Sequence, residues 1–115
     1  MNKKICIINA NYYKNISNNL LKGAFQVLNS KKITKVKIIN VPGVFEIPII
    51  ISKNINKYDA FIALGCVIKG ETPHFDFISS ATTQGIMDIS VHNKKPVGNT
   101  IRDYPIDLFG HTPIS

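Results

Sequence analysis

The stretch GCVIKGETPHFD at residues 65–76 joins an apolar, strand-like segment to the expected start of a helix. Gly65 and Gly70 let the backbone approach a ligand closely. Thr72 is a favoured N-cap residue and Pro73 suits the first helical turn. Because free N–H groups at a helix start favour negative charge, the stretch predicts a phosphate-binding loop. An ordinary capped loop is the alternative.

Three side chains in the same stretch could act on a bound anion. Lys69 supplies positive charge, whereas Glu71 opposes anion binding unless it points outward. His74 lies in the first turn of the expected helix, where the helix dipole favours the neutral imidazole. A neutral imidazole can accept a proton near the working pH, so His74 is the candidate acid–base residue. A capping or solvent-exposed histidine is the alternative.

Apolar segments elsewhere in the chain predict the strands that would position this stretch. β-Branched apolar runs at residues 4–10, 35–41 and 59–68 are typical of buried strands. The third run is apolar throughout, as expected for a central strand of a parallel sheet. A fourth strand-like segment starts at residues 95–97, and no helical pattern follows it.

Segments with apolar residues at helical spacing follow each of the first three strands. Asn15 or Ser17 is expected to cap the first helix. The second helix is expected to begin at residues 45–47, and the third to run from Thr72 to about Asn93. The alternation of strand and helix predicts an α/β fold with a parallel sheet and right-handed crossovers. Ligands then bind beyond the carboxyl ends of the strands.

Three segments follow strand ends at that edge of the sheet. Besides the opening stretch, they are residues 10–13 and 41–46. Tyr12 and Phe45 could sandwich a planar ring, although each could instead belong to the core. Glu46 could bind sugar hydroxyls or simply stabilise the start of the second helix.

Composition limits the remaining function classes. The chain has 115 residues, 44% of them hydrophobic, and this length suits one domain with its own core. The formal charge is +7, but the lysines are spread along the chain, which weighs against a basic nucleic-acid-binding module. No apolar run could span a bilayer and no signal-peptide pattern opens the chain, so we expect a cytoplasmic protein.

The two cysteines are expected to be buried, reduced thiols. Cys6 and Cys66 lie in strand-like runs and show no metal-binding spacing. A catalytic thiol at Cys66 is the alternative, with His74 as the base that could assist it.

Two long motifs give the chain a resemblance to a known family. VPGVFEIP at residues 41–48 and GCVIKGETPHFD at 65–76 resemble the signature stretches of 6,7-dimethyl-8-ribityllumazine synthases. ANYYKNISNNLLKGA at 10–24 and KPVGN at 95–99 match in the same order and spacing. The resemblance covers residues 4–99 of one domain spanning 1–115. It implies a flavodoxin-like, three-layer α/β/α fold, shortened at its C-terminal end.

The resemblance also implies an activity. The family condenses 5-amino-6-ribitylamino-uracil with 3,4-dihydroxy-2-butanone 4-phosphate in the penultimate step of riboflavin synthesis. It uses no metal and no organic cofactor. It assembles as homopentamers, sometimes stacked into larger shells. From the composition, we expect no nucleic acid or membrane partner.

The resemblance assigns site roles by position. His74 is the implied proton-transfer residue, and Gly70, Glu71 and Thr72 belong to the phosphate loop. The implied substrate-binding residues are Tyr12, Val44, Phe45, Glu46, Cys66, Val67, Ile68 and Asn99. Tyr12 would stack on the pyrimidine ring, Glu46 would bind ribityl hydroxyls, and the backbone of residues 66–68 would contact the pyrimidine.

The segment after Asn99 departs from the family pattern. Residues 100–115 read TIRDYPIDLFGHTPIS, and Arg102 does not stand at a recognisable family arginine position. Two readings therefore stay open. The chain is an active synthase, or it is a catalytically impaired homologue that only binds ribityl-pyrimidine or flavin-like ligands.

Overall fold

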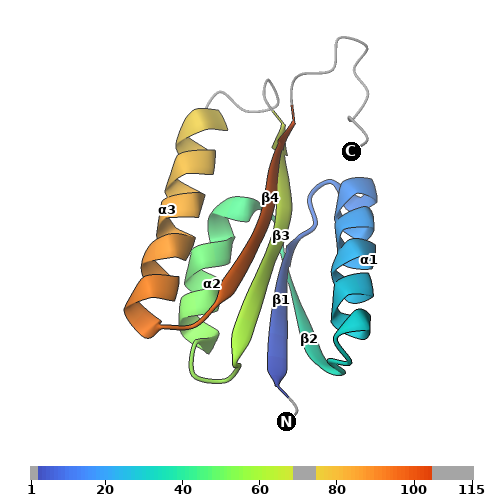
Figure 1. Ribbon diagram of the computed structural model, residues 1–115. Helices are drawn as coiled ribbons and strands as arrows, with labels where there is room; N and C mark the ends of the chain where they lie inside the picture. Colours follow the sequence, from blue (N-terminus) through green and yellow to red (C-terminus); the bar gives the residue numbers. More distant parts are fainter. Residues whose placement is uncertain (1–2, 69–74, 105–115) are drawn as a thin grey trace.

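A four-stranded parallel sheet forms the middle layer of the structure (Figure 1). The computed structural model describes residues 3–68 and 75–104, with side chains at 3–66 and 80–98. The strand order is β2-β1-β3-β4, and every neighbouring pair is parallel. The strands are β1 (Lys4–Ala10), β2 (Lys35–Val41), β3 (Ala60–Ile68) and β4 (Val97–Tyr104). The predicted parallel sheet is confirmed.

Helices cover both faces of this sheet, which confirms the expected three-layer α/β/α architecture. α1 packs on one face, and α2 and α3 pack on the other (Figure 1). A short 3-10 helix, η1, leads into α2. The bounds are α1 (Lys14–Ser30), η1 (Val44–Glu46), α2 (Ile47–Asn54) and α3 (Phe75–Asn93).

β1 is buried on both faces because helices lie above and below it. Ile5 and Ile7 pack into the cluster beneath α1. Cys6 and Ile8 point the opposite way, into the cluster that α2 and α3 cover. The alternation follows from the two-residue period of a strand, and it explains why the run is apolar without interruption up to Asn9.

The start of α1 differs from the sequence expectation. Its N-cap position is Tyr13, which makes no side-chain capping bond, and the helix begins at Lys14. Ser17 was expected as a possible cap, but it lies inside the helix and its backbone N–H donates to the Tyr13 carbonyl at 2.9 Å. Its hydroxyl instead donates to Asn9 in β1, so tertiary contact outweighs local capping.

β4 lies at the edge of the sheet beside β3. Its register runs from Phe61↔Val97 to Ile68↔Tyr104, so the strand continues five residues beyond Asn99. Before β4, the Lys95 ammonium donates to the carbonyls of Ile55 and Tyr58 at 2.6 and 2.7 Å. These bonds join the end of α2 to the segment that enters the edge strand.

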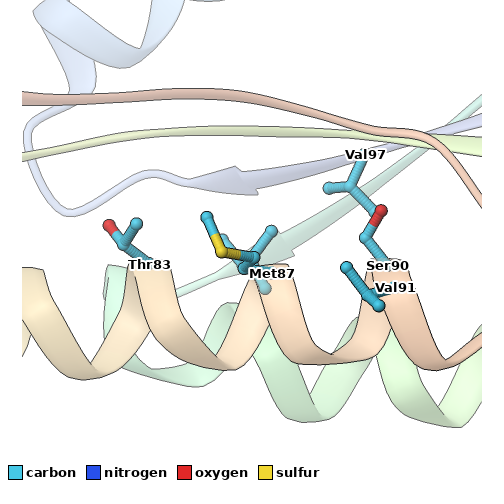
Figure 2. A pocket seen from close by; sticks show the side chains of 6 residues that line it. Thr83, Met87, Ser90, Val91 and Val97 are labelled. Carbon is cyan, nitrogen blue, oxygen red and sulfur yellow. The ribbon is translucent and has the colours of Figure 1, made fainter.

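A pocket of about 170 Å³ lies between α3 and the start of β4 (Figure 2). Met87 and Val91, one helical turn apart, are exposed apolar side chains on this part of α3. The lining residues are Thr83, Ile86, Met87, Ser90, Val91 and Val97.

Gly65 in β3 allows η1 to lie directly against the sheet. A Cβ atom at this position would stand 2.5 Å from Val44 Cγ1 and 3.0 Å from Ala10 Cβ. Both neighbours are buried, so neither can move away without disturbing the core. Glycine is therefore required here because three segments approach closely. From the sequence, the expected reason was instead close approach to a ligand.

We expect Gly65→Ala to lower the free energy of unfolding by about 1–3 kcal/mol, since the added methyl group overpacks the contact with Val44. Urea denaturation followed by circular dichroism measures the change. Gly23→Ala is the matched control, because nothing lies within 4 Å of a Cβ atom at that position in α1. The control is expected to be neutral or to stabilise by up to about 1 kcal/mol. Equal stability of the two variants would contradict the packing argument.

Candidate functional site

The carboxyl ends of β1 and β2 meet at one edge of the sheet. Ala10 pairs with Val41, and the backbone N–H of Asn11 donates to the Val41 carbonyl at 3.0 Å. Residues 10–13 and 41–46 therefore begin side by side, as the sequence predicted. The third predicted segment is described only as far as Ile68. Gly70, Glu71, Thr72 and His74, with Lys69, lie outside the described residues.

β3 extends beyond β1 at this edge. Its pairing with β1 ends at Asn9↔Leu64, whereas its pairing with β4 continues to Ile68. Beyond Leu64, the side of β3 that faces β1 has no strand partner in the described ladders. The backbone groups of residues 66–68 that point to that side have no strand partner in the described ladders, and their role in ligand binding stays a prediction.

Two aromatic side chains are exposed at the same edge. Tyr12 is 73% exposed, and its ring contacts Tyr13 edge-to-face at 4.8 Å between centroids. Phe45, in η1, is 54% exposed. Neither ring is a core residue, so the alternative that they belong to the core is wrong. Both can contact a ligand, although the sandwich around one ring stays a prediction.

η1 divides its three side chains between the core and the solvent. Val44 is 5% exposed and packs against Gly65 and the cluster under α2. A ligand beside η1 would meet the backbone of Val44 and the side chains of its neighbours. Glu46 is exposed and follows Phe45, so its carboxylate can reach solvent from the same short helix. Because Val44 is buried, it holds η1 against the sheet and thereby positions the exposed Phe45 and Glu46.

The Cys66 thiol is buried rather than reactive. It packs against Ile16 at the start of α1. Burial raises the pKa of Cys66 to about 11, and burial likewise raises the pKa of Cys6 to about 11. Both thiols stay protonated at neutral pH, and the thiolate is the nucleophilic form. The expected pair of buried thiols is confirmed, and these pKa values weigh against the catalytic-thiol alternative.

Asn99 lies further from the carboxyl edge of the sheet than the candidates at residues 66–68 of β3. Its backbone pairs with Ala63, whereas Arg102 pairs with Cys66 near the edge. The register therefore places Arg102 closer than Asn99 to the carboxyl edge of the sheet. Only the backbone positions of these two residues are described.

A buried polar network at this edge was missed by the sequence interpretation. The Ser17 hydroxyl donates to Asn9 Oδ1 at 2.9 Å, and Asn9 Nδ2 donates to Asn40 Oδ1 at 3.0 Å. Asn9 and Ser17 are each only 2% exposed. The sequence does contain a sign of this network, because an asparagine stands near the end of each of two apolar strands. These residues, Asn9 and Asn40, are partners in the ladder between β1 and β2.

Within residues 3–68 and 75–104, no cluster of three or more histidine, cysteine or acidic residues could hold a metal ion. Over the same part of the chain, none of the helices combines the length and apolar character needed to cross a membrane.

Comparison with known proteins identifies related sequences. A sequence profile described as 6,7-dimethyl-8-ribityllumazine synthase matches residues 2–104. Proteins with that name from Renibacterium salmoninarum and Cutibacterium acnes are 39% and 37% identical over 95 residues, which are 83% of this chain. The one from Bartonella tribocorum is 42% identical over 106 residues. The matched regions make up 60%, 57% and 70% of those three proteins, so the chain spans less than two thirds of the first two.

We expect both thiols to react slowly with a disulfide reagent such as DTNB in the folded protein. A pKa of about 11 instead of 9.0 lowers the thiolate fraction at pH 8 roughly 100-fold. Reactivity should rise as the pH approaches 11, because deprotonation then becomes favourable. In Cys6→Ala, Cys66 is the thiol that the reagent measures. Unfolding in urea should expose this thiol and make it react rapidly. Rapid modification of folded Cys6→Ala at neutral pH would restore the nucleophile alternative.

Proposed function

The chain belongs to the 6,7-dimethyl-8-ribityllumazine synthase family, and on that premise we propose that it condenses 5-amino-6-ribitylamino-uracil with 3,4-dihydroxy-2-butanone 4-phosphate. The product would be the lumazine that precedes riboflavin. One observation supports the proposal: the exposed Tyr12, η1 and the end of β3, which extends past its described ladder with β1, lie at one edge of the sheet.

The proposed pyrimidine site combines ring stacking with backbone hydrogen bonds. Tyr12 offers an aromatic face, and aromatic rings stack on planar heterocycles. Backbone N–H and C=O groups of residues 66–68 would bind the polar edge of the pyrimidine. The strand that carries these groups is held on its other side by the ladder with β4, so little ordering would be needed on binding.

The proposed ribityl site lies at η1. Glu46 would accept hydrogen bonds from ribityl hydroxyls, and Phe45 would cover the chain of the sugar. Val44 anchors this short helix by packing against Gly65, which fixes the position of both neighbours. Hydrogen bonds to a charged acceptor contribute about 1.5–3 kcal/mol each, enough to orient a flexible substrate.

Phosphate release and proton transfer are assigned to the segment between β3 and α3. In sequence, Gly70, Glu71, Thr72 and His74 lie between Ile68, at the carboxyl end of β3, and Phe75, the first residue of α3. Schiff-base formation, loss of phosphate and ring closure each move protons, and one step expels an anion. Backbone donors at the phosphate loop would stabilise that anion, and His74 would transfer the protons.

Assembly of several copies, as homopentamers, is also part of the proposal. Exposed Met87 and Val91 on α3 border an apolar pocket beside the edge strand (Figure 2). Contact with a second copy would remove this apolar surface from water. Sedimentation equilibrium measures the assembly state, and a stable monomer at high concentration would contradict this part of the proposal.

Lumazine formation tests the proposed activity. We expect the chain to form the product from the two substrates, measured by absorbance, and His74→Ala to lower the rate by about 100-fold or more because the proton-transfer group is lost. His92→Ala is the matched control at the far end of α3 and is expected to leave the rate unchanged. Substrate binding without product formation would favour the binding-only alternative, and an unchanged rate in His74→Ala would remove its assigned role.

Glu46→Gln should weaken binding of a non-reactive ribityl-pyrimidine analogue by about 1.5–3 kcal/mol, because the neutral amide is a weaker acceptor. Isothermal titration calorimetry measures the affinity. Asp88→Asn is the control, since Asp88 is an exposed carboxylate on α3 that accepts a bond from Gln84. Equal affinity of the Glu46 variant and the original chain would show that the carboxylate does not contact the ligand.

A further inference from the structure

A second pocket lies on the opposite face of the sheet from η1. It is formed by the first turns of α1 and the carboxyl ends of β1 and β2, and its volume is about 250 Å³. Its polar lining residues are Asn9, Asn11, Lys14, Ser17, Asn18 and Asn40. Two apolar side chains complete the lining. Val44 and Gly65 of the proposed synthase site face α2 and α3, whereas this pocket opens on the α1 face and adjoins the site only at Asn11, next to Tyr12.

The floor of the pocket is built from buried polar groups. Asn9 and Ser17 line it although each is 2% exposed, and they are joined by a 2.9 Å hydrogen bond. A buried amide costs free energy unless it is paired, so both partners have a single favoured geometry. The floor is therefore rigid, unlike a groove lined only by mobile surface side chains.

The direction of these hydrogen bonds leaves the amide donors of Asn40, an exposed residue that lines the pocket, unused within this network. Ser17 donates to Asn9, and Asn9 donates to Asn40 Oδ1. Asn40 thereby uses its oxygen as an acceptor and keeps both Nδ2 hydrogens. Within the described part of the chain, no protein acceptor binds those hydrogens.

The charge of the lining also favours an anion. Lys14 is exposed at the pocket and forms no ion pair among the described residues. No lining residue is acidic, so nothing neutralises its ammonium group locally. A cation beside amide donors forms short, charge-assisted hydrogen bonds to oxygen anions.

We propose that this pocket binds a small oxyanion, the phosphate or carboxylate group of a small molecule. Lys14 Nζ supplies the charge and Asn40 Nδ2 supplies an oriented donor. Asn9 and Ser17 hold Asn40 in that orientation from below. None of the four residues is among those proposed to bind the synthase substrates, so the pocket is a site additional to that of lumazine formation.

Side-chain amide resonances in ¹H–¹⁵N NMR spectra test the proposal, with the Asn40 signal identified by its loss in Asn40→Asp. Titrations use inorganic phosphate, acetate, and chloride at matched ionic strength. We expect a saturable shift of the Asn40 amide with phosphate, acetate or both, and no comparable shift with chloride. Response to phosphate alone identifies a phosphate ligand, and response to acetate alone identifies a carboxylate.

Matched variants on α1 separate the pocket from general charge effects. Lys14→Gln is expected to weaken the binding at least fivefold, whereas Lys22→Gln, at an exposed position outside the pocket, should leave it unchanged. The proposal is overturned by no saturable Asn40 shift, by an equal shift with chloride, or by equal affinity in the two variants. If phosphate shifts only the NMR signals of residues 65–76, it binds at the proposed synthase site. That result would also contradict the proposal that the pocket binds an anion.

Discussion

β1 lies in the middle of the sheet, and this position limits how the other strands and helices can be placed. It pairs with β2 on one side and β3 on the other, and helices bury both of its faces. A strand in this position must be apolar nearly throughout, since a polar side chain can reach no water. The parallel pairing then brings the carboxyl ends of the three strands to one edge, where the chain turns into its helices. The segments at residues 10–13 and 41–46 begin side by side there because β1 and β2 pair in register.

Asn9 is the exception in this apolar strand, and its partners come from two other elements. Burying an unpaired amide costs about 1–3 kcal/mol, and the bonds to Ser17 and Asn40 offset that cost. The result is a polar connection among β1, α1 and β2 just before the chain reaches Tyr12. Because the bonds form only when all three elements are in register, they also favour one arrangement over shifted ones.

The edge of the sheet separates two surfaces with different chemistry. On the α2 and α3 face, Val44 packs against Gly65 and holds η1 close to β3, with Phe45 and Glu46 exposed beside it. On the α1 face, asparagine, serine and lysine side chains line a polar pocket. The alternation of side chains along β1 and β2 causes this division, since residues one position apart point to opposite faces.

Patterns in the sequence predict the fold class, the strand positions and the segments that follow the strand ends. Apolar runs and helical spacing are local properties, so they predicted β1 and β2 to the residue and β3 to within one residue. The burial of Val44, the exposure of Phe45 and Tyr12, and the raised pKa of Cys66 depend instead on how the elements pack together. Ser17 illustrates the difference. Its local propensity predicted a helix cap, but in the structure it lies inside α1 and donates a 2.9 Å hydrogen bond to the Asn9 amide oxygen in β1. Such contacts join residues from separate elements, and no pattern within one segment of sequence contains them.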